Sequence, residues 1–132
     1  MLAPLFRFVC VPAAISEAPD GWAAEMLSDG HISLLPGEGG LAEVSAVAHA
    51  LDAATVAVVR SETDAAEQER TVTKHAAALP LVWVAETFSP SVRTWAHERG
   101  PMTLLVEAPG ALPETERRRI ERFVALLGRQ AE

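Results

Sequence analysis

The sequence predicts an α/β fold in which a parallel sheet of five strands carries helices on both faces. The first observation is that five short apolar runs alternate with five segments of helical periodicity, an order typical of parallel sheets. The second is that two of the runs show no polar alternation, as expected of strands buried on both faces. The five runs are Leu5–Val11, His31–Leu35, Thr55–Val59, Leu81–Ala85 and Met102–Val106.

The first two runs define the beginning of this pattern. The run Leu5–Val11 ends at Pro12, which has no backbone N–H to donate to a strand ladder. A helix is then expected over Gly21–Ser28, before the second strand. After His31–Leu35 and a glycine-rich connection, apolar residues at helical spacing predict a second helix over Leu41–Leu51.

The third run, Thr55–Val59, is rich in β-branched residues and predicts a central strand. A helix over Asp64–Leu79 follows it and ends at Pro80, because the residue before a proline disfavours helical geometry. Right-handed crossovers, with strands one, three and four in the centre, predict the strand order 2-1-3-4-5. This arrangement is a three-layer α/β/α sandwich.

The last third of the chain repeats the same unit. The run Leu81–Ala85 is followed by a helix over Pro90–Glu98, where Pro90 suits the first turn. The run Met102–Val106 then leads to a final helix over Pro113–Leu127, whose apolar residues recur every three or four positions. We find no linker or low-complexity tract, so the sequence predicts one domain over residues 1–132.

Composition excludes several classes of protein. No apolar run approaches the roughly 20 residues of a membrane span. The amino-terminal stretch has no Lys or Arg before Arg7, so we expect no signal peptide. Cys10 is the only cysteine among the 132 residues, which excludes an internal disulfide and favours a cytoplasmic protein.

Charge argues against nucleic acid and anionic membranes as partners. The chain has 18 acidic and 11 basic residues, a formal net charge of −7, whereas both partners require a basic surface. The one basic cluster, Arg117–Arg122, lies in the final helix among glutamates. A solvated helix face with internal ion pairs is one interpretation of this pattern.

Other candidate motifs give little indication of chemistry. The segment 36–40, Pro-Gly-Glu-Gly-Gly, lacks the spacing of a phosphate-binding loop and has no Lys followed by Ser or Thr. The four histidines do not converge in the predicted fold, and no pair has metal-ligand spacing. We therefore expect neither a metal site nor a hydrolase triad, and no cofactor is indicated.

Polar residues that follow the strands are better candidates, since the carboxyl ends of parallel strands form the usual crevice. Several carboxylates there have the chemistry to hold a divalent cation. The same acids also suit helix caps, which is the alternative interpretation, above all for Asp64. The crevice candidates are Arg60, Ser61, Glu62, Asp64, Glu86, Thr87 and Glu107.

The order and spacing of these elements resemble the receiver domain of bacterial response regulators. The resemblance covers nearly the whole chain and is strongest over residues 81–128, where strand, helix, strand, Pro-containing loop and long last helix follow one another. It rests on architecture. It implies a flavodoxin-like fold and a role in signal transduction.

The residues that carry phosphorylation chemistry in that family are replaced at the matching positions. The resemblance places the phosphoacceptor aspartate at Arg60 and the conserved lysine at Ala108, just before Pro109. An arginine there would fill the anionic pocket by pairing with Glu86 or Glu107. The positions of this degenerate pocket are Pro12, Arg60, Ser61, Ala85, Glu86 and Ala108.

Two functions of different classes remain open. The first is a non-catalytic, receiver-like module that binds another protein or a second copy of itself. The second is an enzyme or binding protein for a small molecule or divalent metal, with its site at the carboxyl ends of the strands. Interfaces favour Trp and Arg, so the first function predicts an interface that includes Arg93, Trp95, Arg117, Arg118 and Arg122.

Overall fold

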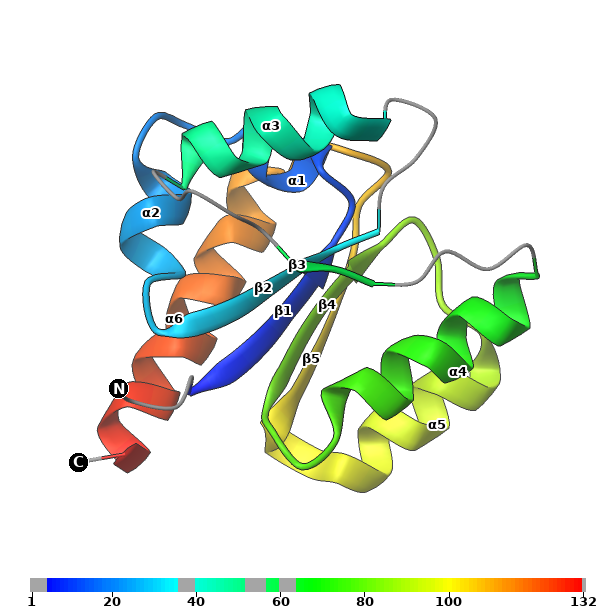
Figure 1. Ribbon diagram of the computed structural model, residues 1–132. Helices are drawn as coiled ribbons and strands as arrows, with labels where there is room; N and C mark the ends of the chain where they lie inside the picture. The colour runs from blue at the N-terminus through cyan, green and yellow to red at the C-terminus, as the bar shows by residue number, and fades with distance from the viewer. Residues whose placement is uncertain (1–4, 36–39, 52–56, 60–63, 132) are drawn as a thin grey trace.

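A five-stranded, entirely parallel sheet forms the centre of the molecule (Figure 1). The computed structural model describes residues 5–35, 40–51, 57–59 and 64–131. The strands are β1 (Phe6–Cys10), β2 (Gly30–Leu34), β3 (Ala57–Val58), β4 (Leu81–Ala85) and β5 (Thr103–Glu107). The α/β class with five parallel strands is therefore confirmed.

Six α-helices connect or follow the strands within the described residues. They are α1 (Ala13–Ser16), α2 (Trp22–Met26), α3 (Gly40–Ala50), α4 (Ala65–Ala76), α5 (Pro90–Arg99) and α6 (Glu114–Ala131), with a 3₁₀ turn over Gly100–Met102. Helix α1 was not predicted. It begins directly after Pro12, whose φ of −54° suits a helix start, and its short alanine-rich sequence carries no periodic signal.

The predicted strand order was wrong. The structure has β3-β2-β1-β4-β5, which places β3 at one edge, instead of the predicted order 2-1-3-4-5. The central strand β1 pairs with β2 along one side and with β4 along the other, so no third strand can lie between β1 and β4.

The error has a physical cause in the composition of the third run. Only Ala57 and Val58 pair with β2, opposite Ser33 and Leu34. The side chain of Val58 is 52% exposed, as suits an edge strand. An apolar, β-branched run indicates a strand, but it does not say which strand is its neighbour. Thr55 and Val56, which the prediction included, lie outside the described residues.

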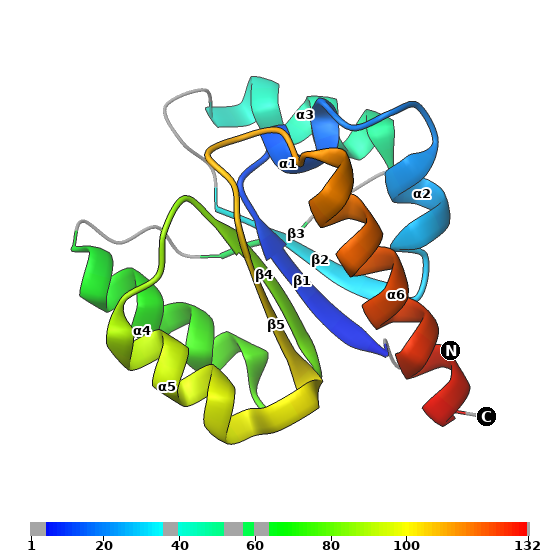
Figure 2. The same cartoon turned by 180° about the vertical axis from the view of Figure 1, so that it is seen from behind.

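Helices lie on both sides of the sheet. Helices α1, α2, α3 and α6 lie on one side, and α4 and α5 lie on the other (Figures 1 and 2). The first side is packed around Phe6, Phe8 and Ile120, and the second around Val9, Trp83 and Val72. Alternate residues of β1 thus enter opposite cores, as the two-residue period of a strand requires.

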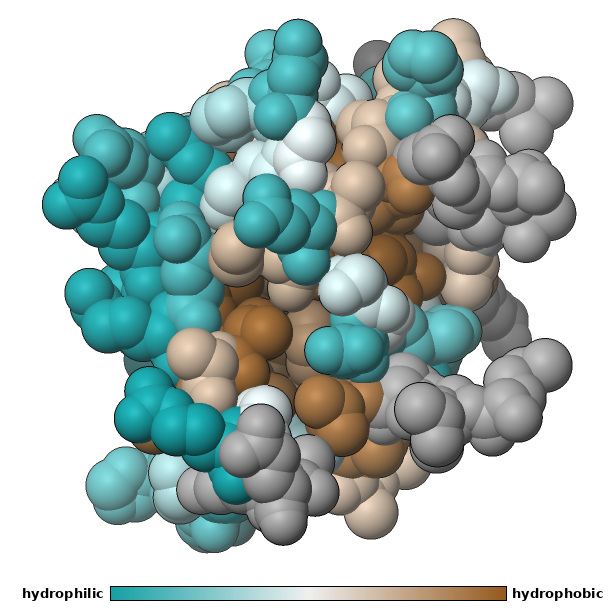
Figure 3. Space-filling view, turned by 90° about the vertical axis from the view of Figure 1, so that its left-hand side faces the viewer, coloured by the Kyte–Doolittle hydropathy of each residue, from teal (hydrophilic) through white to brown (hydrophobic). Residues whose placement is uncertain are grey.

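The side formed by α2 and α6 is shown in Figure 3. Hydrophilic side chains gather along α6, and apolar side chains reach the surface beside them. Half-buried apolar residues of these two helices are Trp22, Met26, Phe123 and Leu127. Among the described helices, none is both long enough and apolar enough to cross a membrane.

Candidate functional site: a groove between two helices

In an open parallel sheet, the crevice lies where the connections from two neighbouring strands run to opposite sides of the sheet. With the observed strand order, that place is at the carboxyl ends of β1 and β4. After β1 the chain runs through the buried Pro12 straight into α1, and Pro12 has no N–H to offer a ligand. Across the crevice, Ala108 donates its backbone N–H to the carbonyl of Ala85 over 2.9 Å. Three positions of the predicted pocket, Pro12, Ala85 and Ala108, thus contribute only backbone groups and apolar side chains.

The acidic candidates at the crevice are dispersed. Glu86 and Thr87 are exposed after β4, and Glu107 forms an ion pair with Arg93 of α5. Asp64 caps α4, with its carboxylate accepting the N–H of Ala66 over 2.9 Å. In the part of the chain that the structure describes, no three metal-ligating side chains come together.

The arginine expected to fill the pocket follows the edge strand. Arg60, Ser61 and Glu62 lie outside the described residues. The strand before them, β3, is separated from β4 by β2 and β1, which is roughly 14 Å at the usual strand spacing. Of the four strands whose ends the predicted pocket required, β1, β4 and β5 are neighbours, and β3 is not.

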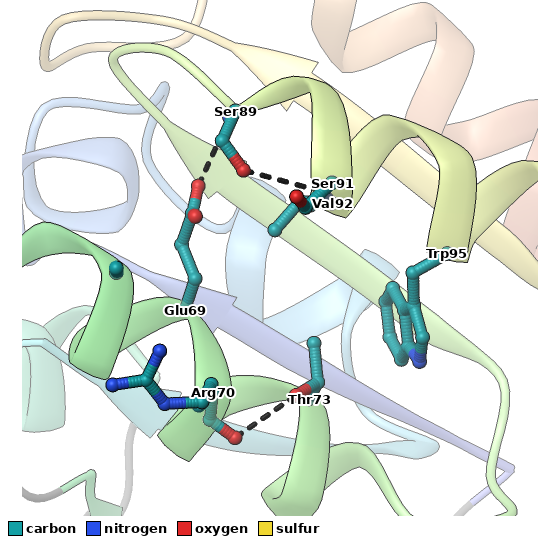
Figure 4. Close-up of a pocket in the computed structure, with 8 residues that line it drawn as sticks. Glu69, Arg70, Thr73, Ser89, Ser91, Val92 and Trp95 are labelled. Atoms are coloured by element: carbon teal, nitrogen blue, oxygen red, sulfur yellow. Dashed lines mark hydrogen bonds between the residues drawn. The ribbon is translucent and has the colours of Figure 1, made fainter.

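A groove of about 330 Å³ lies between α4 and α5 (Figure 4). Apolar atoms line most of it, and polar side chains stand at its edges. The lining residues are Ala66, Glu69, Arg70 and Thr73 of α4, and Ser89, Ser91, Val92 and Trp95 at and after the start of α5. Of the predicted functional residues, only Trp95 lies here.

Two hydrogen bonds fix the end of the groove at the start of α5, which is the upper end in Figure 4. The hydroxyl of Ser89 accepts the N–H of Val92 over 3.2 Å and so caps α5. The carboxylate of Glu69 accepts the backbone N–H of Ser89 over 3.0 Å, which joins α4 to the start of α5. A negative charge is favourable there, because the N-terminus of a helix is the positive end of its dipole.

Farther along α5, the groove is lined by the aromatic ring of Trp95. Trp95 is half-buried, and the guanidinium of Arg99 lies over its ring, 4.7 Å from the ring centre. This cation–π contact holds the indole in place on α5. Beneath the helices, buried Trp83 packs edge-on against Phe88, with 5.2 Å between the ring centres. Both of these side chains belong to the core on this side of the sheet.

Next to the groove, α4 exposes two basic side chains. Arg70 and Lys74 are exposed and stand one helical turn apart. They also line a shallow hollow of about 220 Å³ together with Glu67 and Thr71. Among the ion pairs between described residues, none involves Arg70 or Lys74.

A cluster of polar side chains lies between the sheet and α4. It was not predicted from the sequence. The Ser33 hydroxyl is fully buried and lies 2.8 Å from Nε2 of His75 and 3.3 Å from Nδ1 of His31. Arg7 donates from Nη1 to the same Nδ1 of His31 over 3.3 Å. The sequence separation of 42 residues between Ser33 and His75 leaves no local signal of this contact.

Electrostatics disfavour protonation of both imidazoles. Burial, and then the positive charge of Arg7, lower the pKa of His31 below its ordinary value. Burial, Arg7 and His31, in that order, lower the pKa of His75. Elsewhere in the core, burial raises the pKa of the Cys10 thiol, which favours the unreactive protonated form.

The arginines of α6 have partners within their own segment. Arg117 donates to the carbonyl of Leu112 over 2.6 Å. Arg118 pairs with Glu114 over 2.8 Å, and Arg119 pairs with Glu116 over 2.6 Å. Arg122 is exposed. These residues lie on the opposite side of the sheet from the groove between α4 and α5 (Figure 2).

Comparisons of the chain with protein families, with curated proteins and with solved structures find no significant match.

Proposed function

We propose that the chain is a protein-binding domain whose recognition site is the groove between α4 and α5. The observation that carries this proposal is the half-buried Trp95, which stands beside Val92 in an apolar hollow edged by polar groups. Protein interfaces have this anatomy, with aromatic anchors in the centre and a polar rim. A non-catalytic role in the cytoplasm and a receiver-like ancestry are part of the same hypothesis, although the observed strand order gives that ancestry no support.

The chemistry of the groove favours an acidic segment that carries one apolar anchor. An aliphatic or aromatic side chain fits against Trp95 and Val92, where it leaves water. The exposed cations of Arg70 and Lys74 then complement carboxylates beside the anchor. The groove lies between two helices, and an amphipathic helix that lies in such a groove is a common mode of peptide recognition.

Binding of short synthetic peptides tests this proposal directly. One array carries peptides with a single Leu, Phe or Trp flanked by Asp and Glu at varied spacing. A matched array carries the same anchors flanked by Lys and Arg. We expect binding to the acidic array alone, and we expect the affinity to fall as salt screens the charges.

Three variants show whether the groove is responsible. Trp95→Ala removes the anchor surface and should abolish binding. Arg70→Glu should weaken binding of the acidic peptides at least tenfold, about 1.4 kcal/mol, because attraction becomes repulsion. Arg122→Ala lies on the other side of the sheet and should bind as the unaltered chain does. Acidic peptides that bind all three variants equally, or the absence of any binding, would contradict the proposal.

A further inference from the structure

Polar side chains between β2 and α4 form a hydrogen-bond network that can take up only one additional proton. Arg7 can only donate, so Nδ1 of His31 must be the acceptor and His31 is neutral. The Ser33 hydroxyl donates to Nε2 of His75 when that nitrogen carries no proton. When Nε2 is protonated, the hydroxyl turns to accept from His75 and directs its own proton at Nδ1 of His31, where it shares the single lone pair with Arg7.

A second proton finds no place in this arrangement. Protonation of His31 at Nδ1 would set its N–H against the donor N–H of Arg7 and leave the Ser33 hydroxyl without an acceptor in the cluster. Two imidazolium rings would also face each other, since the ring centres lie 6.0 Å apart. Like charges at this distance in a half-buried site repel strongly.

No compensating negative charge is present among the described neighbours. The charged or titratable groups that face His75 are Arg7 of β1 and His31 of β2, and its neighbour on α4 is the cationic Lys74. Nε of Arg7 is buried and lacks a hydrogen-bond partner, so the guanidinium is already incompletely paired. Burial and Arg7 lower the pKa of both histidines, in agreement with this geometry.

We propose that Arg7, His31, Ser33 and His75 form a pH-sensitive latch, which holds α4 on the sheet at neutral pH and releases it when both histidines are protonated. Other described contacts of α4 include Val72 and Ala76 in the core and Glu69 on Ser89. Helix α4 is one wall of the groove, so acidification separates the two walls and a bound segment leaves. This last step rests on the proposed function, whereas the release of α4 does not.

Hydrogen exchange of the intact protein without any ligand tests the latch. Amide exchange is measured at about pH 7.5 and about pH 5.5 and corrected for the chemical exchange rate. We expect the protection of α4 to fall roughly tenfold at the lower pH, since an imidazole that takes up its proton only when α4 opens favours opening by about a factor of ten per pH unit below its ordinary pKa. The protection of α6, on the other side of the sheet, should change much less.

Substitutions that keep hydrogen bonding but remove titration identify the groups. His75→Gln and His31→Gln should each reduce the effect of pH on α4. His97→Gln, an exposed position on α5, should leave it intact. Titration of the imidazole ring protons in the unaltered chain gives a second measurement that needs no variant, and His31 and His75 should titrate below the ordinary imidazole pKa.

The outcomes separate this proposal from the preceding one. Equal protection of α4 at both pH values overturns the latch, as does a pH effect that persists in both Gln variants or that is equal in α6. Loss of protection in α4 with no peptide binding at either pH supports the latch and contradicts the groove as a recognition site. Peptide binding that weakens in acid together with α4 protection supports both.

Discussion

The carboxylate of Glu69 on α4 accepts the backbone N–H of Ser89, the residue that caps α5, over 3.0 Å. The two residues are 20 positions apart, and all of β4 lies between them. One side chain therefore sets the separation of two helices at the end of the groove where both begin (Figure 4). It also supplies an acceptor for an N–H that the first turn of a helix leaves unpaired.

Removal of that acceptor should destabilise the fold. Glu69→Ala is expected to lower the free energy of unfolding by about 1–2 kcal/mol, because a half-buried bond to a charged group is lost. Glu69→Gln keeps an acceptor and should cost less. Glu67→Ala, an exposed neighbour, should change stability by less than about 0.5 kcal/mol. Urea denaturation measures all three, and equal values for Glu69→Ala and Glu67→Ala would contradict this account.

Asp64 should contribute through its role as a helix cap. Its carboxylate accepts the N–H of Ala66, so Asp64→Ala is expected to cost about 1 kcal/mol. Asparagine caps helices equally well, and Asp64→Asn should be close to neutral. Thermal and urea unfolding followed by circular dichroism test this pair. A loss with Asn as large as the loss with Ala would indicate that the charge, and not the cap, is important.

Truncation to alanine should lower the free energy of unfolding by very different amounts at two positions of α6. Ile120 is fully buried, and Ile120→Ala is expected to cost about 2–5 kcal/mol, because it removes core contacts and leaves a cavity. Leu126 is 53% exposed, and Leu126→Ala should be close to neutral. Similar midpoints of urea unfolding for the two variants would mean that α6 does not pack as described.

Stability should depend on pH through the buried histidines. The pKa values of His31 and His75 are lower in the folded chain than the ordinary 6.5, so the unfolded chain binds more protons in acid. The free energy of unfolding should therefore fall as the pH drops below about 6.5 and stay level just above it. Urea unfolding at a series of pH values measures this. The double variant His31→Gln, His75→Gln should lose that slope, and an unchanged slope would exclude these two groups as its source.

The sequence predicted the elements of the fold well because most of them are local. Alternation of apolar runs with helical periodicity identified all five strands and five of the helices. It could not identify strand neighbours, since Thr55–Val59 looks like a central strand from its own residues alone. The position of that run depends on pairing between Leu34 and Val58, which no local pattern records.

The candidate site was harder to predict for a related reason. Trp95 was selected as an interface residue from its type, yet its place in a groove depends on Glu69 and Thr73 of another helix. His75 was expected to lie apart from the other histidines, and the structure places it beside His31. Its contact with Ser33 exists only once α4 lies across the sheet, so the polar group between them was invisible in the sequence.

The place of β1 at the centre of the sheet also governs how the chain can be made. Its partner on one side, β2, is synthesised soon after it, but its partner on the other side, β4, begins only at Leu81. During translation, the edge of β1 at Arg7, Phe8 and Val9 stays unpaired while some seventy further residues leave the ribosome. An open, apolar strand edge invites pairing with other chains. The edge of β1 that pairs with β4 is therefore open for longer during synthesis than the edge that pairs with β2.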